Sequence, residues 1–284
     1  MSYKKIQEII QNRERMTNKQ KELWDYIITN ASDISILSAS QLAKNASVGK
    51  ATFFRFLKDI GYESYLEFRQ DIHNYVNANI NSNYWQTHAL IKKAEDDKEN
   101  FLYNSIQEAT ELLGNLMTVG LNESFNKAID LIQNSEEIAI LGCRTSKQVA
   151  RYFENLLIPL GKKINQISTD EHLIFDKIST MSPNGVLFLI AGWPYSTAIV
   201  QAGELANKLG IPIIFLANSI SCSISSFADV ILLIPKLDNR YTVIPFVAVL
   251  EAITNDLFSK NHEIVSINLK KIDRTLNKYK QFTW

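Results

Sequence analysis

The stretch that decides the fold is SASQLAKNASVGKATFFRFLK, residues 38–58. From Lys50 onward, at 100° per residue, apolar side chains recur on one arc of a helix, at Phe53, Phe56, Leu57 and Ile60. A shorter helix over about residues 39–45, with Leu42 facing inward, precedes a turn over residues 45–49. This spacing predicts a helix-turn-helix, whose second helix is the element that enters the major groove of DNA.

The remaining arc of that second helix carries most of its polar and positive side chains. We expect four of them to face DNA, some toward base edges and some toward phosphates: Lys50, Thr52, Arg55 and Lys58. Phe54 lies on the same arc and either touches a thymine methyl group or packs on a neighbouring helix. Arg55 either reads a base or forms a structural ion pair. For the whole segment, the alternative is an amphipathic helix pair with ordinary surface lysines.

Composition excludes several classes of protein. The 284 residues leave room for two domains, and 30 Lys and Arg against 30 Asp and Glu give no net charge that would indicate a partner. Two cysteines and four scattered histidines offer no disulfide framework and no metal-ligand spacing, so we expect no metal and no cofactor. A polar amino terminus and the lack of a long apolar run predict a cytoplasmic protein with no membrane partner.

The second half of the chain has a different texture. Short β-branched runs alternate with helical segments from residue 137 onward: EIAILG, KINQI, GVLFLIA, IPIIFLA and VILLIP. Such runs predict a doubly wound α/β domain with a five-stranded parallel sheet buried on both faces. We expect an all-α helix-turn-helix domain over 1–76, a linker with helix over 77–119, the sheet domain over 120–260 and a C-terminal helix over 261–284. The lysines of that last helix are expected to form a solvated face.

Two loops of the predicted sheet domain carry candidate binding residues. In open α/β sheets, ligands bind beyond the carboxyl ends of the strands, where helix N-termini present backbone N–H groups to anions. The loop after the first strand supplies Arg144, Thr145 and Ser146, and the loop after the third supplies Tyr195, Ser196 and Thr197. Because these two strands bracket one crevice, we expect the six residues to line one site for a phosphate or carboxylate. Simple N-capping by the hydroxyls is the alternative in both loops.

The chain resembles the RpiR-type bacterial transcriptional regulators, in which a SIS (sugar isomerase) domain follows a helix-turn-helix domain. The residues that carry the resemblance are ASQLAKNASVGKATFFRFLKDIGYESYLEF and the stretch from IAILGCRTSKQVARYF to FADVILLIP. Together they cover most of the chain, apart from the linker and the tail. The resemblance implies a regulator whose affinity for DNA changes when a sugar or sugar phosphate binds the SIS domain.

Two positions depart from the family pattern. Gly49 stands where a serine is usual before the recognition helix, and glycine is a tolerable N-cap at a cost of about a few tenths of a kcal/mol. SIS enzymes resemble I-S-x-S-G-x-T after the third strand, whereas residues 190–196 read IAGWPYS and keep a hydroxyl only at Ser196. A subset of the regulators, with GxRSS in the first loop and proline-tyrosine-serine in the second, is closer. The effector is therefore either a phosphosugar or another anionic or sugar-like metabolite.

The leading hypothesis is a ligand-responsive transcription factor that binds double-stranded DNA at a palindromic operator. Palindromes match symmetric proteins, so we expect a homodimer or homotetramer, with contacts from the apolar residues of 101–116 and the helices of the sheet domain. Whether the protein is a repressor or an activator stays open.

The rival hypothesis is a SIS-fold sugar-phosphate isomerase or lyase. That chemistry needs an acid and a base beside the substrate, and Glu171 and His172 are the adjacent candidates. We expect both to be surface residues, and we therefore expect no catalytic residue and no enzyme. A third hypothesis is a sugar-binding module whose N-terminal helices serve only as an interaction surface.

Overall fold

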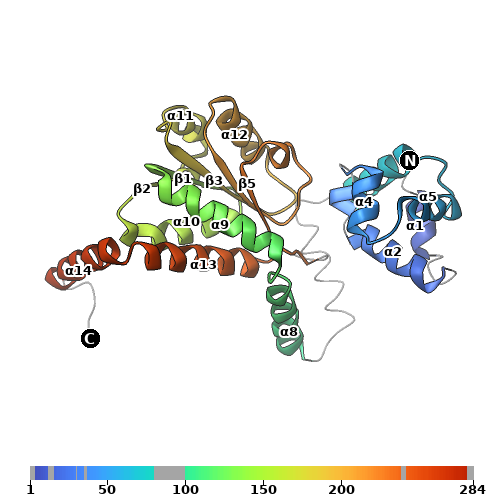
Figure 1. The fold of residues 1–284 in the computed structure, drawn as a ribbon, viewed down its shortest axis with the longest axis horizontal. Coiled ribbons are helices and arrows are strands. Elements are labelled where there is room, and N and C mark those ends of the chain that lie inside the picture. Colours follow the sequence, from blue (N-terminus) through green and yellow to red (C-terminus); the bar gives the residue numbers. More distant parts are fainter. Residues whose placement is uncertain are drawn as a thin grey trace. The chain divides into compact units, whose positions relative to one another are not determined.

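The computed structural model describes residues 4–11, 16–29, 31–34, 37–79, 100–237 and 241–279 (Figure 1). These residues divide into two compact units. The first consists of the described residues up to 79, and the second consists of residues 100–237 and 241–279. Each unit has its own hydrophobic core, and each is described separately below.

The first unit is entirely helical over its described residues, as predicted. Its helices are α1 (Lys4–Gln11), α2 (Asn18–Thr29), α3 (Ala31–Ile34), α4 (Ala39–Asn45), α5 (Lys50–Asp59) and α6 (Tyr65–Asn79). Aromatic rings meet in its core: those of Tyr62 and Phe68 are 5.2 Å apart, and those of Phe53 and Phe68 are 6.4 Å apart, both edge to face. The core therefore joins α5 to α6.

The second unit is built on a five-stranded parallel sheet, which confirms the predicted fold class. The strands follow the order β2-β1-β3-β4-β5. Their bounds are β1 (Glu137–Gly142), β2 (Lys163–Gln166), β3 (Gly185–Ala191), β4 (Ile213–Ala217) and β5 (Val230–Leu233). Each lies in one of the five apolar runs. β1, β3 and β4 are buried along their whole length because helices cover both faces of the sheet.

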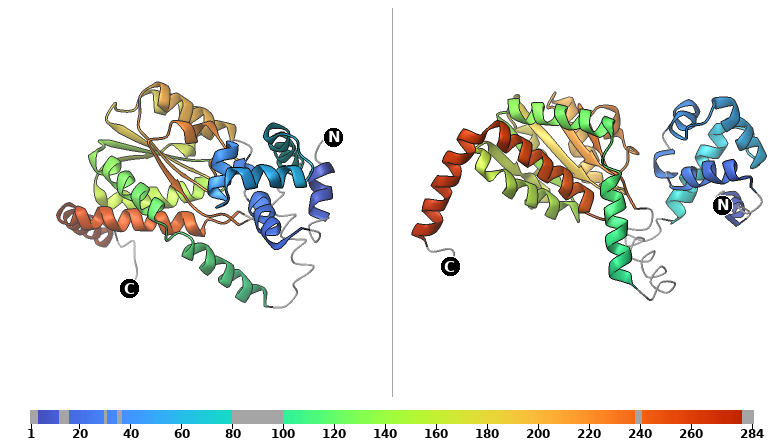
Figure 2. Two further views of the ribbon diagram at one scale, coloured as in Figure 1. Left: turned by 45° about the vertical axis from the view of Figure 1, so that its right-hand side comes forward. Right: turned by 60° about the horizontal axis from the view of Figure 1, so that its bottom comes forward.

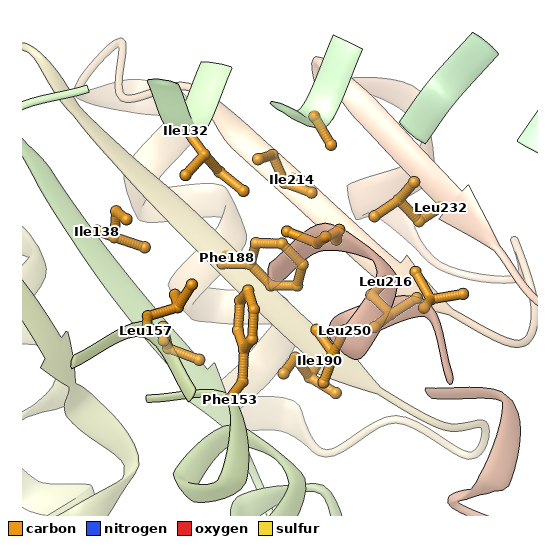
Figure 3. Close-up of a cluster of buried hydrophobic side chains, with 14 of the residues drawn as sticks. Ile132, Ile138, Phe153, Leu157, Phe188, Ile190, Ile214, Leu216, Leu232 and Leu250 are labelled. Atoms are coloured by element: carbon orange, nitrogen blue, oxygen red, sulfur yellow. The ribbon is translucent and has the colours of Figure 1, made fainter. Parts of the chain in front are cut away.

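Helices cover the two faces unequally (Figures 1 and 2). One face carries α9 (Val119–Asn134), α10 (Ser146–Leu157) and α13 (Ile244–Lys260), and the other carries α11 (Ile174–Ser179) and α12 (Thr197–Lys208). Figure 3 shows the core between the sheet and helices α9, α10 and α13, where the rings of Phe153 and Phe188 are 5.0 Å apart. The sheet reverses its winding between β1 and β3, which places the switch point where the crevice was expected.

Two further helices belong to the second unit. α8 (Phe101–Gly114) contacts α13 and runs from the start of α9 away from the sheet (Figure 2). Part of the segment expected to be a linker is therefore a helix of this unit. α14 (His262–Lys278) is attached through Asn268, whose amide donates to the carbonyl of Pro159 at 3.0 Å. Residues 80–99, the rest of the expected linker, lie outside the described residues.

Among the described residues, no helix combines the length and the apolar character needed to cross a membrane.

A buried carboxylate joins β1, β2 and the turn before β3 at the amino-terminal end of the strands. Glu137, at the start of β1, accepts bonds from Asn165 Nδ2 at 2.7 Å and the Ser182 N–H at 3.1 Å, and pairs with Lys163 Nζ at 3.0 Å. Burial raises the pKa of Glu137, but Lys163, Ser182 and Asn165 together lower it below its ordinary value of 4.5. The ionised form is therefore stabilised in the fold.

We expect Glu137→Ala to lower the free energy of unfolding at pH 7 by about 1–3 kcal/mol, because it leaves its partners without an acceptor. Since folding depresses the pKa of Glu137, its contribution is complete above pH 4.5 and is lost as the pH falls through the folded value. Urea unfolding of wild type and variant should therefore converge in acid. Glu136→Ala, at an exposed neighbour, is the control and should have the smaller effect. An equal effect at both positions would contradict this role for Glu137.

Candidate nucleic-acid interface and ligand site

The turn of the helix-turn-helix is defined by its caps. Ser38 and Gln41 form a capping box at the start of α4: the Gln41 N–H donates to Ser38 Oγ at 3.3 Å, and the Ser38 N–H donates to Gln41 Oε1 at 2.9 Å. At the other end, the Val48 N–H bonds the Ala43 carbonyl and the Ser47 N–H bonds the Lys44 carbonyl. This is a Schellman motif, with Ser47 in the left-handed conformation at φ 55°.

The second helix has one buried side and one exposed side, as its spacing predicts. Phe53, Phe56 and Leu57 are buried, and Gly49 is the N-cap without a side-chain bond. The exposed side carries the four expected contact residues, Lys50, Thr52, Arg55 and Lys58. The cationic side chains of α5 are therefore directed to solvent, away from the core of their own unit.

Two residues of this helix had alternative interpretations. Phe54 is half-buried and packs against the core, with its ring 6.0 Å from that of Phe53. That position agrees with packing on neighbouring side chains and leaves only part of the ring accessible. Arg55 is exposed, and no carboxylate among the described residues forms an ion pair with it. The structural ion pair considered for Arg55 is therefore not formed within the described part of the chain.

A groove of about 860 Å³ runs beside the exposed side of α5. Its lining comes from the turn between α4 and α5, from Thr52 and Arg55, and from the first turns of α2, including Lys19 and Gln20. Gln20 Nε2 donates to Asp59 Oδ2 at 3.0 Å, which ties the start of α2 to the end of α5. Sequence reasoning missed Lys19, because the contact between α2 and α5 leaves no periodic signal.

In the second unit, the loop after β1 is tightly turned. Arg144 has φ 54°, and the N–H groups of Ser146, Lys147 and Gln148 donate to the carbonyls of the residues three positions earlier. Backbone N–H groups at the start of this helix were expected to be available to an anion, and these three are instead paired inside the loop. The exposed groups are the side chains of Arg144 and Thr145.

The loop after β3 uses its polar groups in two ways. Ser196 is the N-cap of α12, and its Oγ accepts from the Ile199 N–H at 3.4 Å, which agrees with the capping alternative. The Tyr195 hydroxyl donates to the carbonyl of Ser219, and its ring lies 5.6 Å from that of Phe215. Tyr195 therefore links this loop to the loop after β4. Thr197 is exposed.

The structure brings the two loops together through Cys143. Its thiol hydrogen-bonds the hydroxyl of Ser196, so residues that follow β1 and β3 are in contact. Burial raises the pKa of Cys143 above its ordinary value; the hydrogen bond with Ser196 opposes burial and lowers the pKa, and the Glu171 carboxylate raises it by a smaller amount. The thiol is therefore protonated at neutral pH, and the bond to Ser196 involves no thiolate.

Tyr241 is a residue of this region that sequence reasoning missed. Its hydroxyl shares a hydrogen bond with Ser146 Oγ at 3.0 Å, and its ring lies 5.7 Å from that of Phe246. A Cβ on Gly192 would overlap the Tyr241 ring, so glycine is required where that ring covers the end of β3. Nothing in the local sequence indicates this contact, because Tyr241 is 95 positions from Ser146.

The acid–base candidates are at the surface. Glu171 and His172 are exposed in a single 3₁₀ turn after β2, over Glu171–Leu173, as expected from the sequence. No group of histidine, cysteine and carboxylate side chains in the described residues could hold a metal ion.

Comparison with known proteins agrees with this architecture. The model of the helix-turn-helix domain of the rpiR family matches residues 4–79, and that of the SIS domain matches residues 131–259. A protein of Thermotoga maritima named as an HTH-type transcriptional regulator is 25% identical over 231 residues, 80% of each chain. A similarly named protein of Haemophilus influenzae is 20% identical over 76% of this chain and 75% of its own length.

Two solved structures show the same fold. The Vibrio vulnificus NanR protein complexed with ManNAc-6P has a TM-score of 0.61 at 21% identity, covering 97% of this chain and 98% of that chain. The sugar isomerase domain of an RpiR transcription factor from Sphaerobacter thermophilus has a TM-score of 0.58 at 18% identity, covering 61% and 98%.

The fold and the matched domains define a two-domain regulator that joins a helix-turn-helix to a sugar-isomerase-type α/β domain. The chain belongs to the RpiR-type transcriptional regulators with a SIS domain.

The strained position at Ser47 leads to a prediction about the turn. We expect Ser47→Gly to stabilise the first unit by about 1 kcal/mol, because glycine adopts the left-handed conformation without the clash of a Cβ. Differential scanning calorimetry of the full chain measures the change. Ser40→Gly, at an exposed position inside α4, is the matched control and should destabilise the same unit. If both variants lower the transition temperature, the strain at Ser47 is not relieved by glycine.

Proposed function

We propose that this regulator is a ligand-responsive transcription factor that inserts α5 into the major groove of DNA. The observation that carries the proposal is the exposed arc of Lys50, Thr52, Arg55 and Lys58 on a helix whose other side is buried. Arginine and lysine at such positions bind guanine edges or phosphates, and threonine suits either. The accessible edge of Phe54 supplies an apolar contact to a thymine methyl group. Residues 1–76 are the proposed DNA-binding domain.

The SIS domain, over residues 120–260, is the proposed effector-binding domain. The exposed guanidinium of Arg144 and the hydroxyl of Thr145 lie in the loop after β1, and Ser196 in the loop after β3 is linked to the first loop through Cys143. We assign Ser146, Tyr195 and Thr197 to the same site. A guanidinium beside several hydroxyls suits a sugar phosphate or a related anionic metabolite. The fold shared with NanR, which was solved with ManNAc-6P, supports this class of ligand.

The active form is a homodimer or homotetramer on a palindromic operator. α8 supports this proposal, because its apolar side chains are exposed although it contacts α13: Phe101, Leu102, Tyr103, Ile106 and Leu113. Five large apolar side chains exposed on one helix, with Leu102 75% exposed, are typical of a surface that contacts another protein. A second copy that covers these side chains would place two α5 helices at one operator.

Effector and DNA are linked through the arrangement of the two sheet domains. A ligand shifts that arrangement only by its difference in affinity between the two states, which is typically about 1–3 kcal/mol. The protein performs this role in the cytoplasm, where its DNA lies. It is a regulator and not an isomerase, since Glu171 and His172 are exposed on a surface turn and the relatives are named transcriptional regulators.

Replacing the central arginine of the arc tests the DNA-binding proposal. We expect Arg55→Ala to weaken binding to operator DNA by about 5- to 150-fold, the equivalent of about 1–3 kcal/mol for a base-reading arginine. Fluorescence anisotropy with DNA upstream of the gene measures this loss at a fixed salt concentration. Lys208→Ala, which removes one charge from exposed α12, is the control and should bind as wild type. Unchanged affinity of the Arg55 variant would remove that residue from the interface.

A thermal-shift screen tests the effector proposal. We expect a sugar phosphate to raise the unfolding temperature of the SIS domain, because a ligand that binds only the folded state stabilises it. Arg144→Ala should abolish most of this shift, since it removes the exposed cation of the loop. Arg151→Ala, at an exposed position on α10, is the charge-matched control and should retain the shift. A shift that survives Arg144→Ala would place the anion elsewhere.

A further inference from the structure

One of the proposed effector residues is covered by the chain itself. Ser146 is only 4% exposed, although it is the first residue of α10 and lies beside the switch point between β1 and β3. Its hydroxyl is bonded to the Tyr241 hydroxyl at 3.0 Å. A ligand therefore cannot reach Ser146 Oγ while Tyr241 keeps this position.

Tyr241 lies over the end of β3 as well. Its ring occupies the space beside Gly192, where a side chain at position 192 would overlap the ring. The ring also packs on Phe246 at the start of α13, with the two ring planes tilted by 40°. The tyrosine thus joins three points: the start of α10, the end of β3 and the start of α13. Two of these points border the switch between β1 and β3, where ligands bind in open α/β sheets.

We propose that Tyr241 is an internal competitor for the effector site, whose hydroxyl occupies the position that a ligand oxygen takes on Ser146. This inference rests on the effector function proposed above. A ligand displaces the phenol, and the ring leaves its place over Gly192. The bond that Ser146 makes to Tyr241 is then replaced by a bond to the ligand.

The exchange makes the site selective. A neutral ligand hydroxyl forms a hydrogen bond to Ser146 of about the same strength as the bond from the phenol that it replaces. The binding free energy gained at Ser146 is therefore small, while the packing of the Tyr241 ring is lost. A phosphate or carboxylate oxygen accepts a shorter, charge-assisted bond from the serine hydroxyl and gains more. Tyr241 therefore favours anionic sugars over neutral sugars, in addition to the contribution of Arg144.

The cost of displacement lowers the apparent affinity. A protein whose binding-competent state is a minor fraction binds with its intrinsic affinity reduced by that fraction. Weakening the hold of Tyr241 should therefore tighten ligand binding. A tyrosine that contacts the ligand directly has the opposite effect, because its removal weakens binding. The sign of the change thus separates the two roles.

The test measures binding of ManNAc-6P by titration calorimetry to the full chain and to two variants. We expect Tyr241→Phe, which keeps the ring and loses the bond to Ser146, to bind about 2- to 12-fold more tightly, the range for one net hydrogen bond. Tyr241→Ala, which also frees the space over Gly192, should bind at least as tightly as Tyr241→Phe. Tyr152→Phe is the matched control, because it also removes one tyrosine hydroxyl. Tyr152 is on α10, and its hydroxyl donates to Glu251 of α13, away from Ser146. It should bind as wild type.

A second measurement follows Tyr241 itself and needs no variant. Nitration by tetranitromethane, mapped by mass spectrometry, should increase at Tyr241 when ManNAc-6P is added, while Tyr279, which is 69% exposed and lies outside the proposed oligomer contact, serves as the internal reference. Equal or weaker binding by both Tyr241 variants, or protection of Tyr241 by ligand, would overturn the competitor proposal and leave the effector proposal intact. If the wild type and both variants bind neither ManNAc-6P nor inorganic phosphate, the effector proposal fails and the competitor proposal fails with it.

Discussion

The burial of Phe53, Phe56 and Leu57 is the constraint on which the DNA-binding account depends. These side chains fix the rotation of α5 in its unit, and a helix fixed on one side must present the opposite side to solvent. The capping box of α4 and the Schellman turn at Ser47 set where α5 begins. The bond from Gln20 to Asp59 attaches its far end to α2. The positions of the cations therefore follow from apolar packing and hydrogen bonds, and no ion pair among the described residues holds Lys50, Arg55 or Lys58 in place.

The sheet domain applies the same logic to a different ligand. β1, β3 and β4 are buried along their whole length, and the strand order brings the loops after β1 and β3 to one end of the sheet. The polar residues there are not all free: Ser196 caps α12, Tyr195 links two loops, and Ser146 is bonded to Tyr241. A site whose polar groups are already paired exchanges hydrogen-bond partners when a ligand binds. Such an exchange gives a ligand different interactions in two states, which is what a regulatory domain requires.

Much of this architecture could be predicted from the sequence, and the reasons are physical. The strands were predictable because a parallel sheet buried on both faces needs unbroken apolar runs. The exposed side of α5 was predictable because the spacing of apolar residues along a helix is a local pattern. The contact of Tyr241 with Ser146 was not, since it joins segments distant in the chain and depends on packing around Gly192. The sequence also did not indicate that the loop after β1 pairs three of its own N–H groups, because these local bonds depend on the backbone conformation of the loop, in which Arg144 has φ 54°. Local patterns predict elements and exposed faces, while the state of each polar group depends on the folded chain around it.

The central claim is that the exposed arc of α5 is the surface that touches DNA, and acetylation footprinting of lysines tests it most directly. Lys50 and Lys58 lie at the two ends of the arc, and Lys127 and Lys208 are exposed references on the sheet domain. With operator DNA bound, the account predicts that acetylation falls at Lys50 and Lys58 and is unchanged at the two references. If DNA is bound while Lys50 and Lys58 react as fast as in the free protein, α5 does not lie in the groove.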